Sequence, residues 1–287
     1  MDGFLIINKP LGYTSRDIVN MVGKHLGTKK IGHTGTLDPN ASGVMILAIG
    51  KALKLCELIK EHNKEYIAEV ILGIETDTLD MDTNATIIKE EKVNISDEKI
   101  YEAVNSFKGK YLQEVPKYSA VKVNGRKLYE YARSNTPVDL PKKEVTINNI
   151  EVINNVIQKD GKIYFKIKTN VSSGTYIRAL VRDIGKKLGV PSVMNSLVRT
   201  SINKFNITDS YTLDDIGSNN YKLISITDMF SEIQVVKVDN KLAFKVKNGV
   251  ILDKFFDSEM AFIVDKDNNL LALYKNSDNK SRLFKML

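Results

Sequence analysis

One polar loop, residues 31–44, concentrates the side chains of this sequence that could do chemistry. It reads IGHTGTLDPNASGV and holds three glycines, three hydroxyl residues, His33 and a single carboxylate, Asp38. Pro39 biases the Asp38 backbone towards an extended conformation, and the glycines permit close approach of another molecule. Such a loop can present one carboxylate for catalysis at the edge of a core. Loops of this composition also serve as plain turns, so the pattern alone leaves both interpretations open.

A guanidinium on a predicted helix could support that carboxylate. Arg178 falls in the first turn of this helix, and Arg182 lies one turn further along the same side. An arginine can keep a nearby carboxylate ionised through a bidentate pair, and a solvated helix face is the alternative. Tyr66 stands at the start of a predicted strand, and Tyr176 stands at the start of this helix. A tyrosine at such a place either packs or offers a ring on which a base can stack.

An acidic loop partly matches a calcium-binding EF-hand. Asp80, Asp82, Asn84 and Glu91 occupy positions 1, 3, 5 and 12 of that pattern. Ala85 stands at the sixth position, where the sharp turn needs glycine, the preceding segment alternates like a strand, and no second copy exists. We therefore interpret the segment as a solvated acidic loop, while the sequence leaves open whether residues 75–91 bind a cation.

Other cofactor and metal motifs are absent from the sequence. It contains no GxxxxGK[ST], no GxGxxG after a strand, no HExxH and no GxSxG. The three histidines, His25, His33 and His62, lack the spacing of a metal site, and Cys56 is predicted to be a buried thiol among apolar neighbours. We expect neither a metal nor a cofactor.

Strands and helices of mixed order must position these residues. Ser15 is predicted to cap a helix that ends at Gly27, and Ser172–Thr175 are predicted to cap a helix that Gly189 and Pro191 stop. Further helices are expected at 51–59 and 97–107, and strands at 4–8, 44–49, 66–72, 118–123, 145–153 and 163–169. Strand and helix do not alternate regularly, which favours the α+β class over a doubly wound sheet.

The charge distribution indicates a polyanion as partner. The chain carries 42 basic and 35 acidic residues, a formal net charge of +7. Residues 61–110 hold 12 acidic and 6 basic side chains, so the basic excess lies in the flanking segments. Basic segments around an acidic insert fit a surface that binds nucleic acid. A lysine-rich solvated surface is the alternative.

The length of 287 residues allows one large domain with a small appendix. The pattern of predicted elements changes near residue 230, after which short strands predominate. We therefore expect a catalytic domain over 1–230 and a β-rich module over 231–287. One cysteine cannot form an internal disulfide. No apolar stretch approaches the roughly 18 residues of a membrane span, and the N-terminus lacks the pattern of a signal peptide. These features predict a cytosolic protein without membrane contact.

Six segments together resemble the tRNA pseudouridine synthase family of the TruB type. They are NKPLGYTS, GHTGTLDPNASGV, KEYIAEVILGIETDT, VPKYSAVKVNGRKLYEYAR, SSGTYIRALVRDIG and MNSLVRTSI, in order over about residues 3–205. The resemblance implies a mixed, largely antiparallel sheet core with flanking helices, followed by a small PUA-like module. It also implies a monomer that needs no obligate protein partner and isomerises uridine 55 in the T arm of tRNA to pseudouridine.

The resemblance assigns roles residue by residue. Asp38 is expected to be the catalytic aspartate, Arg178 its partner, and Tyr66 the ring that stacks on the target uracil. The residues expected to bind the substrate are His33, Tyr176, Lys9 and Leu197, with Lys9 and Pro10 in the structural N-terminal motif. The segment LDMDTN after Thr78 and the ending RTSINKF depart from the family pattern.

Two other functions remain open from the sequence. A tRNA-binding or RNA-folding module without catalysis would use the same basic and aromatic residues. A nucleoside hydrolase would need a second, suitably placed acid, and the sequence does not show one. A pure binder has no use for a carboxylate held beside an RNA backbone, so the pairing of Asp38 with Arg178 distinguishes the isomerase from the binder.

Overall fold

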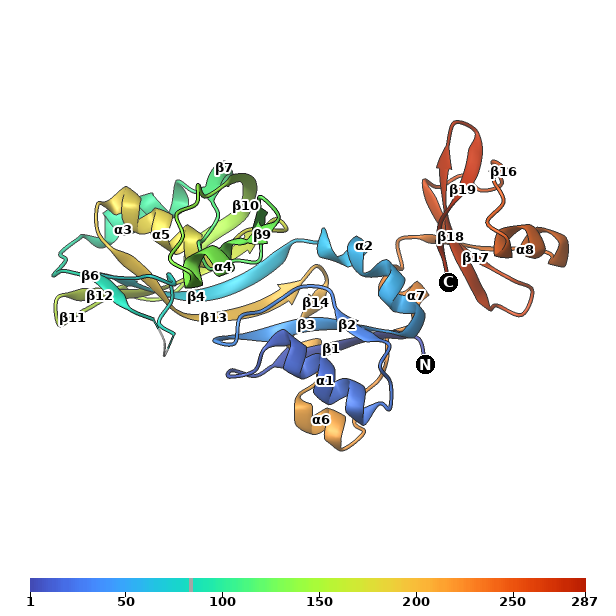
Figure 1. The fold of residues 1–287 in the computed structure, drawn as a ribbon, viewed down its shortest axis with the longest axis horizontal. Helices are drawn as coiled ribbons and strands as arrows, with labels where there is room; N and C mark the ends of the chain where they lie inside the picture. The colour runs from blue at the N-terminus through green and yellow to red at the C-terminus, as the bar shows by residue number, and fades with distance from the viewer. Residues whose placement is uncertain (83–84) are drawn as a thin grey trace.

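A ten-stranded mixed sheet forms the centre of the computed structural model, which describes residues 1–82 and 85–287 (Figure 1). Its strands run in the order β1-β3-β13-β4-β12-β10-β7, with β2, β14 and β11 paired to β3, β13 and β12. Every described pairing in it is antiparallel except that of β3 with β13. The predicted α+β class with a largely antiparallel sheet is confirmed. The strands are β1 (Gly3–Lys9), β2 (Ile31–His33), β3 (Ala41–Ile49), β4 (Lys64–Leu72), β7 (Gly109–Glu114), β10 (Lys142–Val152), β11 (Ile157–Lys159), β12 (Lys162–Val171), β13 (Ser192–Ile202) and β14 (Phe205–Asn206).

Helices cover the sheet and bury its apolar residues. α1 packs Ile18 and Val22 against Leu5 and Met45 of β1 and β3. α3 and α5 lie beside each other and contribute Ile100 and Leu180, among others, to the largest core cluster. The helices of this part are α1 (Ser15–His25), the 3-10 helix η1 (Gly50–Leu55), α2 (Cys56–Lys60), α3 (Asp97–Asn105), α5 (Ile177–Leu188), η2 (Ile207–Asp209), α6 (Leu213–Gly217) and α7 (Ile226–Met229). No helix in the described ranges is long and apolar enough to cross a membrane.

Two helix starts differ from the sequence-based expectation. Thr14 caps α1, because its side chain accepts from the Asp17 N–H and Asp17 accepts from Thr14 in return. Ser15 is left free to bond elsewhere. α5 begins only at Ile177, and its N-cap residue Tyr176 makes no side-chain cap bond. Its end is as predicted, since Gly189 adopts the left-handed conformation at φ 75°.

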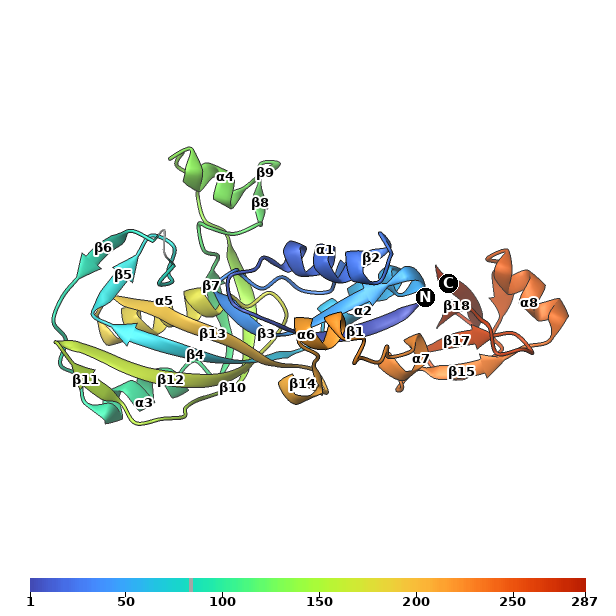
Figure 2. The ribbon, with the colours of Figure 1, turned by 90° about the horizontal axis from the view of Figure 1, so that it is seen from below.

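A basic and aromatic arm, residues 116–136, projects from the main sheet (Figure 2). It contains the short strands β8 (Lys122–Val123) and β9 (Arg126–Lys127) and the helix α4 (Leu128–Arg133). Only two residues of the strand expected at 118–123 are extended and paired, because the hairpin reverses the chain directly afterwards. Arg126 lies 4.7 Å from the centre of the Tyr131 ring, and Arg133 lies 5.4 Å from that of Tyr129. A separate hairpin joins β5 (Ile74–Thr76) to β6 (Ile87–Glu90).

A second, five-stranded sheet follows the central one in the chain. Its order is β15-β17-β18-β19-β16, and α8 packs against it. Phe262 and Leu273 of this sheet share a core cluster with Phe4 and Phe230, which joins the two sheets through apolar contact. The elements are β15 (Gln234–Lys237), α8 (Asn240–Lys247), β16 (Leu252–Asp253), β17 (Met260–Val264), β18 (Leu270–Ser277) and β19 (Lys280–Met286).

Candidate active site

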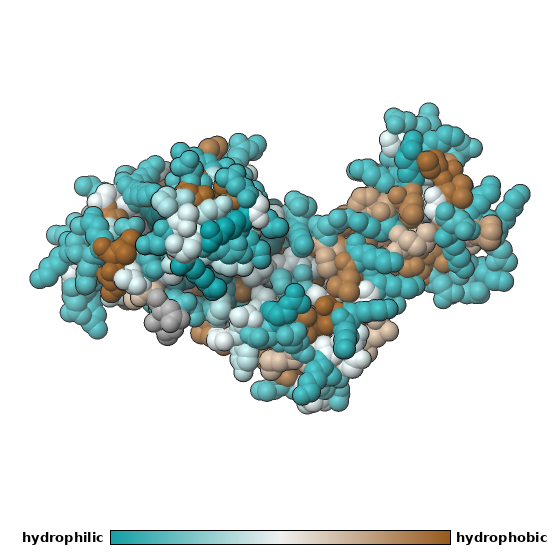
Figure 3. All heavy atoms as spheres, viewed as in Figure 1, coloured by the Kyte–Doolittle hydropathy of each residue, from teal (hydrophilic) through white to brown (hydrophobic). Residues whose placement is uncertain are grey.

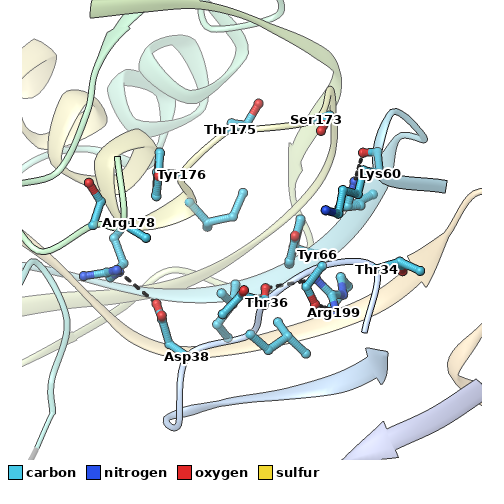
Figure 4. Close-up of a pocket in the computed structure, with 18 of the residues that line it drawn as sticks. Thr34, Thr36, Asp38, Lys60, Tyr66, Ser173, Thr175, Tyr176, Arg178 and Arg199 are labelled. Carbon is cyan, nitrogen blue, oxygen red and sulfur yellow. Dashed lines mark hydrogen bonds and ion pairs between the residues drawn. The ribbon is translucent and has the colours of Figure 1, made fainter. Parts of the chain in front are cut away.

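A pocket of about 610 Å³ opens between the loop at residues 33–38, the sheet face of β4 and β13, the arm and the start of α5 (Figure 4). Seven residues were predicted from the sequence to form the site, and six of them line this pocket. They come from segments far apart in the chain and are His33, Asp38, Tyr66, Tyr176, Arg178 and Leu197.

Asp38 and Arg178 meet at one end of the pocket. An oxygen of the Asp38 carboxylate lies 3.0 Å from Nη2 of Arg178, and Figure 4 shows the two side chains pointing towards each other. The Asp38 side chain is 43% exposed, whereas that of Arg178 is 10% exposed. The carboxylate is therefore open to a substrate, and the guanidinium approaches it from the protein side.

Arg178 also fixes the surroundings of the pair. Its guanidinium donates to the carbonyl of Thr78 at 2.9 Å and to that of Tyr118 at 3.3 Å. One side chain thus binds the segment after β5, the base of the arm and Asp38.

A second carboxylate, Asp80, lies behind the guanidinium. Its nearer oxygen is 3.9 Å from Nε of Arg178, and Thr78 donates a hydrogen bond to the other oxygen at 2.8 Å. Burial raises the pKa of the Asp80 carboxyl, while Arg178 acts in the opposite direction. The interpretation of Asp80 as part of a solvated loop is therefore wrong, since the residue is only 7% exposed. Local sequence does not show this burial, because it depends on distant segments, namely β13 beside its backbone and Arg178 of α5 beside its carboxylate.

The EF-hand alternative gains no support from the described residues. Asn84 lies outside them, and within the described ranges no group of three or more His, Cys, Asp or Glu side chains could hold a metal ion.

The loop that carries Asp38 is held from behind. The Ser15 hydroxyl donates to the Leu37 carbonyl at 3.0 Å and accepts from the Leu37 N–H at 2.8 Å. Lys9 is completely buried and donates to the carbonyls of Pro10, Tyr13 and Pro39. Burial lowers the pKa of Lys9 to about 8. Lys9 therefore supports the loop from inside, and the expected contact with substrate does not fit a side chain with no exposed surface.

Arg199 is a second buried support that the sequence did not single out. It is 1% exposed and donates from Nε to the Val44 carbonyl at 2.6 Å. Its two other nitrogens reach the carbonyls of Thr36 and Gly35 at 3.4 and 3.3 Å. Gly43 makes this possible, because a Cβ there would lie only 2.2 Å from the Arg199 carbonyl oxygen. β13 can therefore approach the loop closely enough for Arg199 to hold it.

The other predicted residues that line the pocket are aromatic or apolar. Tyr66 and Leu197 are each 7% exposed on the floor formed by β4 and β13. Burial lowers the pKa of His33, so its ring is neutral near pH 7, and in the described structure its Nδ1 is buried without a hydrogen-bond partner. Burial raises the pKa of Tyr176, so its phenol stays protonated.

Gln113 fixes the residue from which α5 starts. Its side-chain amide accepts from the Tyr176 N–H at 2.8 Å and donates to the Tyr176 carbonyl at 3.1 Å. Gln113 is 1% exposed. This pair of bonds fixes the backbone of the N-cap residue of α5 and thereby the position of Arg178 two residues later.

Comparisons with known proteins were made for the whole chain. A family model described as "TruB family pseudouridylate synthase (N terminal domain)" matches residues 23–177. The tRNA pseudouridine synthase B of Caldanaerobacter subterraneus is 39% identical over 277 residues, which cover 96% of this chain and 92% of that protein. The protein of the same name from Bacillus subtilis is 35% identical over 297 residues, which cover 99% and 96%.

Solved structures show the same fold at lower identity. A chain of an H/ACA RNP bound to a substrate RNA containing 2'-deoxyuridine gives a TM-score of 0.68 at 21% identity, over 99% of this chain and 84% of that one. A chain of a Cbf5-Nop10-Gar1 complex gives a TM-score of 0.67 at 21% identity, over the same shares. The likeness extends through both sheets.

Proposed function

Because the chain belongs to the TruB family of pseudouridylate synthases, we propose that it isomerises uridine 55 in the T arm of tRNA to pseudouridine. The observation that carries this proposal is the open Asp38 carboxylate held 3.0 Å from Arg178 in a pocket with an aromatic floor. The curated relatives are tRNA pseudouridine synthases and align over nearly their full length.

The reaction needs one carboxylate and no net hydrolysis. The bond from N1 of uracil to C1′ breaks, a bond from C5 to C1′ forms, C5 loses a proton and N1 gains one. Asp38 either attacks C1′ or removes the C2′ proton to give a glycal, and the geometry is compatible with both routes. Arg178 stabilises the negative charge of Asp38 before the reaction. Asp80 is turned towards Arg178 and does not line the pocket, which disfavours a glycosidase that uses two carboxylates.

The target base has to leave its stack to reach Asp38, which costs a few kcal/mol. Tyr66 offers a ring on which the everted uracil stacks, and Leu197 provides an apolar wall beside it. His33 lines the pocket, and its neutral ring contacts the displaced nucleotide in this proposal. The Tyr176 hydroxyl, protonated because burial raises its pKa, is available as a donor near the reacting sugar.

Residues 1–230 act as the catalytic domain in this proposal, and residues 231–287 as a PUA-like RNA-binding module. α8 carries Phe244, which is 71% exposed, among the lysines at 241, 245 and 247. An exposed ring among lysines fits RNA. Figure 3 shows a mostly hydrophilic face, with hydrophobic spheres visible over this module. We also propose that the protein acts in the cytosol as a monomer without an obligate protein partner, because one chain supplies the whole lining of the pocket.

Replacement of Asp38 by asparagine tests the function. We expect Asp38→Asn to bind tRNA as the wild type does but to convert uridine at less than about one thousandth of its rate, because the amide can neither attack C1′ nor remove a proton. Substrate and product have equal mass, so tritium release from C5 and carbodiimide labelling are the measurements. Asp257→Asn, a fully exposed carboxylate in the C-terminal module, is the control. Undiminished turnover of Asp38→Asn would contradict the proposal, and a wild type that binds without conversion would favour the tRNA-binding module.

A further inference from the structure

Two buried cations meet on the floor of the pocket beside Tyr66. Arg199 lies directly opposite Tyr66 on the neighbouring strand, and Lys64 lies two residues before Tyr66 on β4. Alternate residues of a strand share a face, so the three side chains form one continuous surface. Lys64 is 9% and Arg199 1% exposed, yet both line the pocket.

Gly35 leaves a small space between the two cations. A Cβ at this position would lie 3.7 Å from Nη1 of Arg199 and 3.8 Å from Cε of Lys64. The ends of two basic side chains from different strands therefore converge on a residue that has no side chain of its own. Figure 4 shows Arg199 beside Tyr66, with Asp38 and Arg178 further along the pocket.

Among the described residues, no carboxylate forms an ion pair with Lys64 within 4.0 Å, and Glu61 acts on it only from a greater distance. Its ammonium donates to the carbonyls of Lys60 at 3.0 Å and His62 at 2.7 Å. An ammonium has three N–H donors, so one is left for a ligand. Burial and the neighbouring Arg199 lower the pKa of Lys64 to about 8, as expected for a charge without a counter-charge.

Arg199 is in the same situation. Three carbonyl bonds use three of the five N–H donors of its guanidinium. Within the ranges 1–82 and 85–287, no carboxylate oxygen lies within 4.0 Å of either Lys64 or Arg199. Burying a charge costs free energy unless an opposite charge compensates it. A bound anion would supply that compensation here.

We propose that Lys64 and Arg199 form an anion subsite that binds a backbone phosphodiester of the RNA next to the target nucleotide. The inference rests on the proposed function, because it takes RNA as the ligand of the pocket. A phosphodiester carries a full negative charge and two free oxygens, which suit the remaining donors of the two side chains. The uracil oxygens carry only partial charge and would not balance two cations. The reacting sugar is placed at Asp38, away from this pair. A phosphate held beside Tyr66 would fix the strand adjacent to the everted base.

Neutral phosphate analogues test this subsite directly. A set of T-arm stem-loops is prepared, each with one methylphosphonate, which removes the negative charge of a single linkage. The substituted linkage is one of the two nearest to the target uridine on its 5′ side or one of the two nearest on its 3′ side. We expect one of these RNAs to bind the wild type about tenfold more weakly. The same substitution should weaken the binding of Lys64→Met clearly less than it weakens that of the wild type, because only Arg199 is left to bind the charge of that linkage. Lys159→Met, at an exposed position of β11, should respond as the wild type does.

Two results would overturn the subsite. The first is a flat scan, in which no methylphosphonate weakens wild-type binding more than twofold. The second is additivity, in which each methylphosphonate weakens RNA binding by the same factor in Lys64→Met as in the wild type. Lys64→Arg guards against a folding defect, since it keeps a cation and should keep the tenfold response. Conversion of the unmodified stem-loop is measured alongside. If the wild type converts it but the scan is flat, only the subsite fails. If it binds with one sensitive linkage but does not convert, the proposed function fails.

Discussion

Nη2 of Arg178 lies 3.0 Å from an oxygen of Asp38, and this pairs a cation that is only 10% exposed with an anion that is 43% exposed. The same guanidinium binds the carbonyls of Thr78 and Tyr118 and faces Asp80. The guanidinium of Arg178 therefore has two roles, since it pairs with the charge of Asp38 and also holds the segments of Thr78 and Tyr118 together. The predictions below separate these contributions.

Arg178→Lys should lower kcat about a hundredfold, because an ammonium cannot reproduce the contacts of a planar fork. The measurement is single-turnover conversion of a T-arm stem-loop. Arg182→Lys is the matched control, since Arg182 is equally buried on the same helix but pairs with Glu114 and Asp183. Equal rates for the wild type and Arg178→Lys would mean that the pair with Asp38 does not contribute to catalysis.

Asp80→Asn should lower kcat about tenfold with little change in KM, corresponding to about 1.4 kcal/mol in the barrier. The amide no longer balances the charge of Arg178 from behind, while the pocket wall is unchanged. Asp183→Asn removes a carboxylate that lies 2.9 Å from Arg182 and should leave kcat unaltered. A change in KM alone would place Asp80 in binding and not in the support of Arg178.

Gln113→Leu should cost about 1–3 kcal/mol of unfolding free energy, because the partly buried Tyr176 N–H loses its acceptor. The Tyr176 carbonyl keeps the hydrogen bond from the Leu180 N–H. It should also lower kcat, since the start of α5 and with it Arg178 would shift. Urea unfolding and stem-loop turnover measure the two effects. Gln113→Glu keeps the acceptor for the Tyr176 N–H but loses the donor to the Tyr176 carbonyl. Its unfolding free energy and kcat should lie between those of the wild type and Gln113→Leu. A stability loss with unchanged kcat would restrict Gln113 to a structural role.

Lys9→Met should change how stability depends on pH. The pKa of Lys9 is lowered from 10.5 to about 8 in the folded protein, so between these values the unfolded chain binds more protons and the wild type gains stability as pH rises. Lys9→Met lacks this gain. The difference in unfolding free energy, wild type minus variant, should therefore rise between pH 8 and pH 10 by up to about 1.4 kcal/mol per pH unit. A difference that stays constant over this range would show that Lys9 is not buried as a charge.

The sequence predicted those parts of the molecule that local patterns encode. The stripe of apolar residues in α5 fixed its buried face, and the loop at 31–44 showed its carboxylate through composition and Pro39. The roles of Gln113 and Arg199 and the place of Asp80 beside Arg178 were not predicted, because each of these side chains acts on a residue far away in the chain. The contact of Arg178 with Thr78 spans 100 positions, and that of Arg199 with Val44 spans 155. Neither periodicity nor spacing carries information over such separations.

The parallel pairing of β3 with β13 in the central sheet has a consequence for the order in which the enzyme matures. It brings Gly43 against Arg199, so the aspartate loop gains its support only when the chain has been synthesised beyond that strand. Closing so long a segment is entropically costly and slow. A nascent chain on the ribosome could thus already hold β1 and β3 as an antiparallel pair but would have no competent site, and activity would arise late and abruptly during synthesis.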